Sequence, residues 1–363
     1  MSIRSIIRDL FPYRFMIERY KGQYAAMDNY IMPKDTNGVD LKKDTPSKFK
    51  NIISIQGFGY SGSGTIVDYL REYSNCRVLG YVSKEGSKAS RKEALSEIDI
   101  LRLAGGLFEV EKYLDSKNVF INDALLHRMR RNFTSSSLFR TIPEIQPYFV
   151  SFFNSMVEYS MDNMSQTYYN SFLTYPCENR SIYFLKQMPL GVYREMSRNF
   201  LNNVLNHFHD GNTDYLVVDQ MFSDFEFDMV KNQEYLPGLK IVFVIRDPRD
   251  LYAWANYKKV EWIPQDLDGF LRWYKIMLEP LDLQTSNALV LRYEEICLDF
   301  DKQEKRIIDY LNLDAQKHIL PRSSFDPDTS KRFVSIWKHS FMPKDHFDII
   351  KKDLGIYCCE MVD

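Results

Sequence analysis

Residues 56–65 read Gln-Gly-Phe-Gly-Tyr-Ser-Gly-Ser-Gly-Thr, and this stretch decides the fold class. It follows an apolar run at residues 51–56 and precedes apolar residues at positions 66, 67, 70 and 73, which have helical spacing. The sequence therefore predicts a buried strand, a glycine-rich loop and a helix in succession. Glycines let a backbone approach a ligand closely, and successive N–H groups with nearby hydroxyls bind anions. We expect an anion site built from Gly57, Tyr60, Ser61, Gly62, Ser63, Gly64 and Thr65.

The spacing of the loop residues narrows the class of anion. Gly57 and Gly62 have the spacing of a Walker A loop, but Ser63 stands where that motif has Lys. This Lys is the main contact of the β- and γ-phosphates of ATP in a Walker A loop. Since it is missing, a P-loop nucleotide kinase is disfavoured and is kept as the first alternative function. A dinucleotide site is also disfavoured, because the nearest acidic candidate, Glu85, lies in a polar loop rather than at a strand end.

Strand and helix patterns alternate along the rest of the chain. Strands are predicted at residues 76–81, 119–122, 181–185, 215–218, 240–245 and 288–291, and helices at residues 192–208 and 302–311, among others. This alternation predicts an α/β fold with a P-loop-like parallel sheet flanked by helices. Residues 85–215 are too long for a simple crossover and are expected to form a helical acceptor-binding insertion. The expected organisation is an N-terminal helix and linker (1–50), a main domain (51–345) and a C-terminal tail (346–363).

A second motif follows the apolar run at residues 240–245. The chain continues Arg246-Asp247-Pro248-Arg249-Asp250, and a helical pattern begins at Leu251. An Arg that leaves a buried strand at the carboxyl edge of the sheet is well placed to hold a phosphate with two hydrogen bonds. The alternative is an ion pair with Asp247 or Asp250 that only caps the helix.

Together these segments resemble the sulfotransferase family that uses 3′-phosphoadenosine 5′-phosphosulfate (PAPS). Two further stretches agree with the family: Leu-Arg-Tyr-Glu-Glu-Ile at residues 291–296 and Ser-Lys-Arg-Phe-Val-Ser-Ile-Trp at residues 330–337. The resemblance covers roughly residues 51–340. It implies a PAPS-dependent sulfotransferase whose glycine-rich loop holds the 5′-phosphosulfate and whose Arg246 holds the 3′-phosphate. It also implies that Lys331 and Arg332 lie in a late loop over the nucleotide.

The chain departs from the family at several of these positions. Tyr60 stands where relatives have Lys or Arg, and Trp254 stands where many have Ser. Ser335 occupies the place of a frequent Gly, and the segment that begins at Lys186 lacks the histidine base of the cytosolic members. A catalytically inactive nucleotide-binding scaffold is therefore the second alternative.

Sulfuryl transfer needs an oriented acceptor hydroxyl, a base and positive charge near the leaving phosphate, and it requires no metal. The candidate bases are Glu97, His127 and Asp219. Glu97 has a counterpart in the glycan-modifying branch of the family, His127 follows the predicted strand 119–122, and Asp219 ends the predicted strand 215–218. Lys186, at the end of the predicted strand 181–185, is the candidate for the missing positive charge, and an exposed Lys in water is its alternative.

The acceptor is expected to be a small molecule or a glycan. Residues 148–175 carry twelve aromatic or Met side chains, which could wall a pocket for a sterol-like alcohol or stack on sugar rings. An ordinary helical core is the alternative for this stretch.

Composition excludes several other classes of function. The 363 residues carry 47 Lys and Arg against 49 Asp and Glu, so a nucleic-acid coat protein is not expected. The five cysteines have no metal-ligand spacing. The N-terminus lacks a signal-peptide core, which favours the cytoplasm. Residues 1–20 begin with a short amphipathic helix pattern, so a weak contact with a membrane surface is an alternative to docking on the domain.

Overall fold

The computed structural model describes residues 41, 43–79, 107–115, 119–135, 138–139, 142–161, 182–221, 233–278 and 288–362. The chain divides into two compact units. The smaller unit holds Met1–Leu41 and Glu109–Pro189, and the larger unit holds Lys42–Phe108 and Leu190–Asp363. The predicted N-terminal helix and Glu97 lie outside the described residues.

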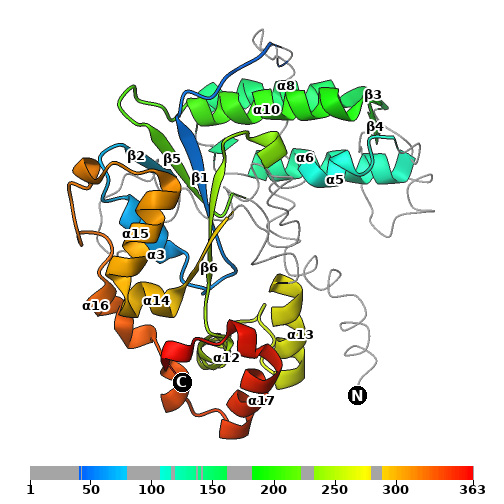
Figure 1. Cartoon of the computed structure of the whole chain (residues 1–363). Coiled ribbons are helices and arrows are strands. Elements are labelled where there is room, and N and C mark those ends of the chain that lie inside the picture. The colour runs from blue at the N-terminus through cyan, green and yellow to red at the C-terminus, as the bar shows by residue number, and fades with distance from the viewer. Residues whose placement is uncertain are drawn as a thin grey trace, which may run out of the picture. The chain divides into compact units, whose positions relative to one another are not determined.

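A five-stranded parallel sheet forms the centre of the larger unit, which confirms the predicted fold class (Figure 1). Its strands are β1 (Asn51–Gln56), β2 (Cys76–Leu79), β5 (Tyr215–Asp219), β6 (Lys240–Ile245) and β7 (Leu289–Arg292). They lie in the order β2-β5-β1-β6-β7. β1 is therefore a central strand between β5 and β6, and the chain segments that leave these three strands meet at the carboxyl edge of the sheet.

The helices of the larger unit are α3 (Gly64–Leu70), α10 (Leu190–Asn206), α12 (Pro248–Lys258), α13 (Leu267–Leu278), α14 (Tyr293–Leu298), α15 (Phe300–Leu311), α16 (Pro327–Ser330) and α17 (Lys344–Leu354). Short 3₁₀ turns are η3 (Ala315–Lys317), η4 (Lys331–Phe333), η5 (Ile336–His339), η6 (Gly355–Tyr357) and η7 (Glu360–Val362). α5 (Leu107–Glu111) crosses the boundary between the two units.

Apolar side chains cover both faces of the sheet, as expected for parallel strands. On one face Ile53, Ile55, Val217, Val242 and Val244 pack with apolar residues of α3, α14 and α15 in one core cluster, and Figure 1 shows these helices together on one side of the sheet. Because side chains alternate along a strand, the intervening residues point to the other face. Ile52, Leu216, Val218, Ile241 and Phe243 are also buried there.

The segment before β1 is irregular but held in place. Asparagines spaced along α10 bond its backbone: Asn199 Oδ1 accepts from Thr45 N, Asn202 Nδ2 donates to Thr45 O, and Asn206 bonds both Lys48 N and Pro46 O. The spacing of three, four and seven residues places these side chains on one helix face. The linker expected here is thus fixed to the larger unit at residues 45–48.

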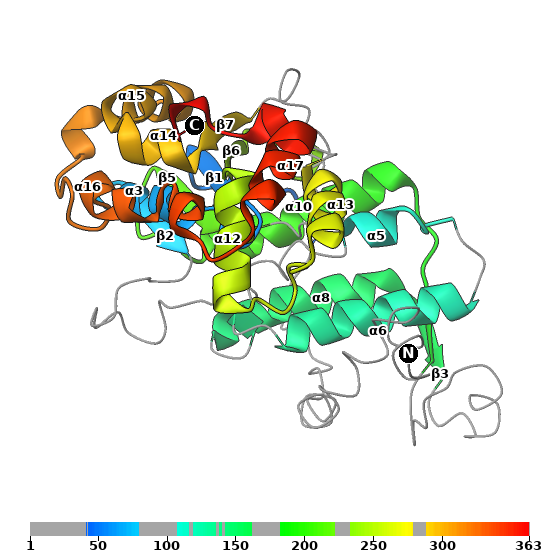
Figure 2. The same cartoon turned by 90° about the horizontal axis from the view of Figure 1, so that it is seen from below.

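The smaller unit contains α6 (Val119–Ser135), η1 (Pro143–Ile145), α8 (Gln146–Met156), β3 (Val157–Met161) and β4 (Ile182–Leu185). Figure 2 shows α6 and α8 side by side. The strand predicted at residues 119–122 is wrong, because these residues begin α6. The apolar run continues with Leu126, Met129 and Phe133, all buried, so it belongs to the buried face of a helix.

The strand predicted at residues 181–185 exists as β4, but it does not join the parallel sheet. It pairs antiparallel with β3 in a separate two-stranded sheet, and α6 packs against it. β3 itself was not predicted. Tyr183 N donates to Asp123 Oδ1 on α6, which ties the strand pair to the helix.

No helix in the described part of the chain is long and apolar enough to span a membrane.

Candidate functional site

The glycine-rich loop, residues 57–65, joins β1 to α3 and turns sharply at two positions. Tyr60 has φ +66° and Gly62 has φ +93°. Ser61 N donates to Phe58 O at 2.9 Å, and Thr65 closes the turn through N and Oγ1, which both donate to Gly62 O. A tyrosine with positive φ is strained, and such strain is concentrated at functional sites in proteins. The loop therefore has a defined shape that a chain without Gly62 could not adopt easily.

Several donors of this loop have no acceptor among the described residues. They include the N–H groups of Gly62, Ser63 and Gly64, which are consecutive in the chain. The Ser61 hydroxyl is also buried without a hydrogen-bond partner. Buried polar groups are normally satisfied, so a donor left without a protein partner indicates a ligand, ion or water. The arrangement can hold an anion such as a phosphate group.

The glycines of the loop are required by close neighbours. A Cβ at Gly62 would lie 2.2 Å from Cδ2 of Tyr293, and a Cβ at Gly59 would lie 2.2 Å from the ring of Trp262. A Cβ at Gly57 would lie 2.2 Å from the Ser61 hydroxyl oxygen. A Cβ at Gly64 would meet nothing within 4 Å. Three of these four glycines are therefore fixed by packing, and Gly64 leaves open space beside the unused N–H groups.

Arg246, which follows β6, connects the loop to the other predicted nucleotide segments. Its Nη1 donates to Tyr60 O at 3.2 Å, and its Nη2 donates to Phe333 O at 2.6 Å. Its guanidinium lies over the ring of Tyr293 at 4.9 Å from the centroid. Its Nε is buried and has no hydrogen-bond partner among the residues that the structure describes. A guanidinium has five N–H donors, so donors remain for an anion after these two carbonyl bonds.

Aromatic side chains surround the outer part of the loop. The rings of Tyr60 and Trp262 are parallel within 10°, with centroids 6.0 Å apart, and both side chains are about half exposed. Trp254 lies edge-on to Tyr60 and to Phe333. The indole Nε1 of Trp254 is a buried donor that has no partner among the described residues. Trp254 thus keeps a hydrogen-bond donor next to Tyr60 and Phe333, the two residues whose carbonyl oxygens Arg246 bonds.

The two aspartates after Arg246 serve the scaffold. Asp247 caps α12: its Oδ1 accepts from Arg249 N and Nε, and its Oδ2 accepts from Arg249 Nη2 and Cys359 N. Asp250 accepts from Ser335 N and Trp337 N, which holds the late loop. Burial raises the pKa of Asp250 to about 6, while Arg246 opposes this shift. The alternative for Arg246 was an ion pair with Asp247 or Asp250. The hydrogen bonds of both carboxylates go to other groups.

Glu294 lies under this network and is fully buried. Its Oε1 accepts from Asp247 N at 3.0 Å, and its Oε2 has no partner among the described residues. Burial, assisted by the neighbouring carboxylate of Asp247, raises the pKa of Glu294 to about 8. The side chain therefore holds a proton at neutral pH.

The structure describes three of the four predicted catalytic residues. Asp219 ends β5, one residue before the loop's neighbour Gln220, and is 6% exposed. His127 and Lys186 belong to the smaller unit. His127 is on helix α6, not after a strand as predicted, with Nε2 3.3 Å from Asp123 Oδ1. Lys186 is exposed and follows β4. Of the four, Asp219 alone is described in the same unit as the loop, because Glu97 lies outside the described residues.

Lys331 and Arg332 lie on η4, next to Phe333. Lys331 Nζ donates to Asp328 Oδ1 at 2.7 Å, and the Arg332 guanidinium lies over the ring of Phe333 at 4.7 Å. Both side chains are exposed. Arg246 therefore bonds the backbone of η4 at Phe333, while the side chains of Lys331 and Arg332 face solvent.

The aromatic stretch at residues 148–175 is described as far as Met161. Phe149, Phe152, Phe153 and Met156 on α8 are buried, and Phe149 packs edge-on against Phe133 and Phe139. This part of the stretch is helical core, the alternative that was considered for it. Residues 162–175 lie outside the described part of the chain.

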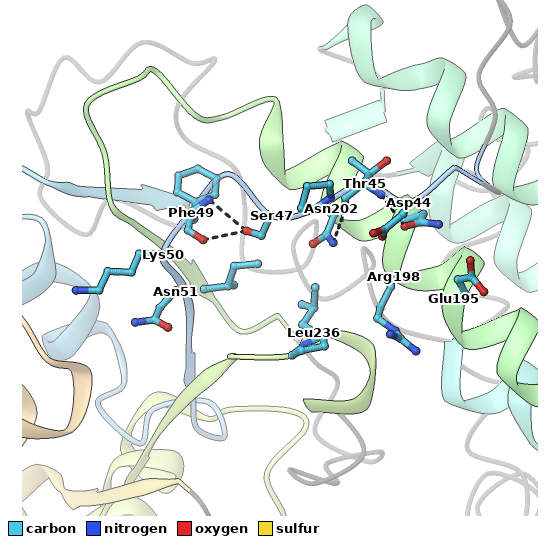
Figure 3. Close-up of a pocket in the computed structure, with 14 residues that line it drawn as sticks. Asp44, Thr45, Ser47, Phe49, Lys50, Asn51, Glu195, Arg198, Asn202 and Leu236 are labelled. Carbon is cyan, nitrogen blue, oxygen red and sulfur yellow. Dashed lines mark hydrogen bonds between the residues drawn. The ribbon is translucent and has the colours of Figure 1, made fainter.

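A separate cavity of about 230 Å³ lies at the amino end of β1 (Figure 3). It is lined by polar residues such as Thr45, Asn51, Arg198 and Asn202. Because the glycine-rich loop follows the other end of the same strand, this cavity does not belong to the anion site. Among the described residues, no group of His, Cys, Asp and Glu side chains is arranged to hold a metal ion.

The sequence interpretation missed three residues that shape the site. Gln220 contacts Ser63, Tyr293 packs beneath Gly62, and Trp262 packs over Gly59. Tyr293 belongs to the segment at residues 291–296 that resembles the sulfotransferases, but no role was predicted for it. Gln220 and Trp262 had no local signal, because their contacts come from the strand order and from the turn after α12.

Comparison with known proteins gives little further information. No protein-family model matches the chain, and no curated protein sequence matches it. Among solved structures, the sulfotransferase domain from the Synechococcus PCC 7002 olefin synthase is similar. The match covers 89% of this chain and 98% of that chain, with 12% sequence identity and a TM-score of 0.38. Likeness at this level does not establish a shared function, so the chain's own residues must carry one.

Proposed function

We propose that this protein is a sulfotransferase that transfers the sulfuryl group of PAPS to an acceptor hydroxyl. One observation carries the proposal. Arg246 bonds the backbone of the glycine-rich loop at Tyr60 and the backbone of the late loop at Phe333, and it lies over Tyr293. These are the four segments on which the sequence resemblance rests, and they meet around one guanidinium.

The donor set supports a ligand with two separate anionic groups. The unused N–H groups at residues 62–64 and the Ser61 hydroxyl form one set, and the remaining donors of the Arg246 guanidinium, among them Nε, form another. PAPS carries a 5′-phosphosulfate and a 3′-phosphate, whereas ATP carries all three phosphates at the 5′ position of the ribose. In this proposal the first donor set holds the 5′-phosphosulfate and the second holds the 3′-phosphate.

The residues of the chain have distinct tasks in the reaction. PAPS supplies an activated sulfuryl group that an acceptor hydroxyl displaces in line from the 5′-phosphate. The loop N–H groups fix the position of the leaving phosphate and stabilise the negative charge that develops on it. With Tyr60 in place of a cation, backbone dipoles carry more of this stabilisation than in sulfotransferases that have Lys at this place. Lys186 is the proposed additional cation.

A base must take the proton of the acceptor hydroxyl. Glu97, His127 and Asp219 are the proposed candidates, and Glu97 is the first of them. We expect Glu97→Gln to abolish turnover and to leave nucleotide affinity intact. Near-normal turnover would transfer the role to His127 or Asp219. The proposed acceptor is a lipophilic alcohol or a glycan hydroxyl.

The first test is a calorimetric titration of the whole chain with 3′-phosphoadenosine 5′-phosphate, ADP and ATP. A strong preference for the 3′-phosphorylated nucleotide is the expected result. A preference for ATP would favour a nucleotide kinase. Binding of the 3′-phosphorylated nucleotide without turnover on any acceptor would favour an inactive scaffold, and no nucleotide binding would contradict the proposal.

Arg246→Ala tests the 3′-phosphate role directly. Hydrogen bonds to charged groups are worth about 1.5–3 kcal/mol, so we expect the affinity for 3′-phosphoadenosine 5′-phosphate to fall by about 10- to 100-fold. AMP lacks the 3′-phosphate, so its affinity should change by less than about threefold. Arg322→Ala is the control, because Arg322 is exposed and pairs only with Asp328 among its described neighbours. An equal loss for both nucleotides would contradict the assignment.

A further inference from the structure

Gln220 is a strained residue beside the anion loop. It follows β5 directly, is 2% exposed, and has φ +51°, a left-handed conformation that L residues other than Asn and Asp rarely adopt. Its N–H donates to Ile55 O on β1 at 2.9 Å. Such strain persists only where the surroundings fix the residue, and it is concentrated at functional sites. The conformation of Gln220 therefore raises the question of what its side chain does.

The side chain of Gln220 reaches into the loop. Its amide Nε2 donates to the hydroxyl oxygen of Ser63 at 3.1 Å. Ser63 is the N-cap residue of α3, but its side chain makes no capping bond to the helix. An N-cap serine normally accepts a hydrogen bond from the first turn of its helix. In this chain Gln220 takes the place of that donor.

The direction of this hydrogen bond determines what the Ser63 hydroxyl can do. A hydroxyl has one proton and two lone pairs, and an amide N–H₂ can only donate. When Gln220 donates to Ser63, the proton of the hydroxyl remains available for another acceptor. The unused N–H groups of Gly62, Ser63 and Gly64 indicate an anion site at the same turn. The Ser63 hydroxyl can then act as a further donor to that anion, beside the three N–H groups and the Ser61 hydroxyl.

We propose that Gln220 is a positioning residue that holds the Ser63 hydroxyl as a donor toward the phosphate bound by the loop. This inference rests on the proposed nucleotide site and adds a residue from a neighbouring strand to it. It explains why a buried glutamine occupies a strained position where glycine would be easier. It also explains why an N-cap serine does not cap its helix.

Three substitutions separate this role from a structural one. Gln220→Asn tolerates the left-handed conformation but is one methylene too short for Ser63, so affinity for 3′-phosphoadenosine 5′-phosphate should fall by about 3- to 10-fold. Gln220→Glu can only accept from Ser63 and brings a negative charge, so its loss should exceed about tenfold. Gln220→Gly removes the amide and relieves the strain. It should lower affinity like Gln220→Asn while the melting temperature stays equal or rises.

Matched variants control for strain and for the partner. Asn312→Gly relieves a left-handed residue (φ +56°) at the end of α15 and should leave affinity unchanged. Ser63→Ala removes the proposed donor and should itself weaken binding by about 3- to 10-fold. In the Ser63→Ala background, Gln220→Asn should cause no additional loss, because both changes remove the same interaction.

The outcomes distinguish this inference from the proposed function. If the wild-type chain binds 3′-phosphoadenosine 5′-phosphate but Gln220→Asn binds it within twofold of wild type, the inference is wrong and the site stands. A Gln220→Glu variant with wild-type affinity would mean that the Ser63 proton points to residue 220, which also overturns it. An additional loss in the Ser63→Ala background would show that Gln220 acts through another group. If the wild-type chain binds no nucleotide, the proposed function fails and this inference fails with it.

Discussion

Two loops leave adjacent parallel strands at the same edge of the sheet, and they are built on opposite principles. The loop after β1, residues 57–65, has four glycines and keeps several donors without acceptors among the described residues. The charged loop, residues 246–250, joins β6 to the first turn of α12. It has no glycine, and its two aspartates accept six hydrogen bonds from the chain. The first loop retains donors for a ligand, and the second uses its acceptors to hold the scaffold.

Arg246 connects the two loops. It is the first residue of the charged loop, and its guanidinium bonds the glycine-rich loop at Tyr60 O and the late loop at Phe333 O. A buried Arg needs either a counter-charge or many hydrogen bonds. The carboxylate of Asp247 bonds Arg249 and Cys359, and Asp250 lowers the cost of burying Arg246 only through its charge, because the direct contacts of Arg246 are two carbonyl oxygens and an aromatic face. An anionic ligand would add a direct charged partner.

The comparison predicts that breaking the charged loop costs mainly stability, and the largest effect is expected for Asp247→Ala. This change removes the carboxylate that pairs with the guanidinium of Arg249, a side chain that is 2% exposed. Removal of one partner of a buried pair costs about 3–5 kcal/mol, and we expect a loss of this size in the free energy of unfolding measured by urea denaturation.

Asp328→Ala is the control for that variant. Asp328 pairs with Arg322 and Lys331, but all three side chains are about half exposed or more. Exposed pairs contribute about 0–1 kcal/mol, so this variant should unfold close to wild type. Similar losses in the two variants would mean that the network around Asp247 is not the anchor that its hydrogen bonds suggest.

Breaking the glycine-rich loop should cost somewhat less stability but should also abolish anion binding. Gly62→Ala places a methyl group 2.2 Å from the Tyr293 ring at a φ of +93°. The steric and conformational penalties together come to about 2–4 kcal/mol in the free energy of unfolding. Gly64→Ala is the matched control, because its methyl group meets nothing within 4 Å and Ala favours a helix start over Gly. If both variants are equally stable, the loop is less rigid than its contacts imply.

The sequence predicted the central sheet well because buried parallel strands are continuous apolar runs. Residues 51–56 and 240–245 match β1 and β6, β5 extends one residue beyond its prediction, and β7 is shifted by one residue. β2 matches its prediction as far as Leu79, where the described residues end. The prediction was wrong at residues 119–122. A short apolar run does not distinguish a strand from one turn of a buried helix, and the helical spacing appears only further along, as far as Phe133.

The glycine-rich loop and Arg246 could be predicted because their chemistry is local in the sequence. Gln220 could not, because its φ and its contact with Ser63 arise only once β5 lies beside β1. The roles of the C-terminal residues were hidden for the same reason. The expected tail contains most of α17, and Cys359 bonds both Asp247 and Arg249. Long-range contacts of this kind leave no periodic signal in the chain.

The smallest effect on the free energy of unfolding is expected for Glu294→Gln. This substitution next to the charged loop changes the charge of a side chain but not its shape. Glu294→Gln keeps the oxygen that accepts from Asp247 N and removes the ability to ionise. Because the pKa of Glu294 is raised to about 8 in the folded state, the folded chain binds more protons than the unfolded chain between pH 4.5 and about 8. The stability of the wild-type protein should therefore fall as pH rises through this window.

The variant lacks this linkage, so its stability relative to wild type should increase with pH. The gain should be about 1 kcal/mol between pH 6 and pH 7, measured as the free energy of unfolding in urea at each pH. Asp250, whose pKa is raised to about 6, has the same sign in both proteins and cancels in the difference. Glu295→Gln, on the same helix but partly exposed, should follow the wild-type curve. A Glu294→Gln curve parallel to wild type would mean that the buried carboxyl group is already ionised at pH 6. The charged loop would then hold one more negative charge than its hydrogen bonds account for.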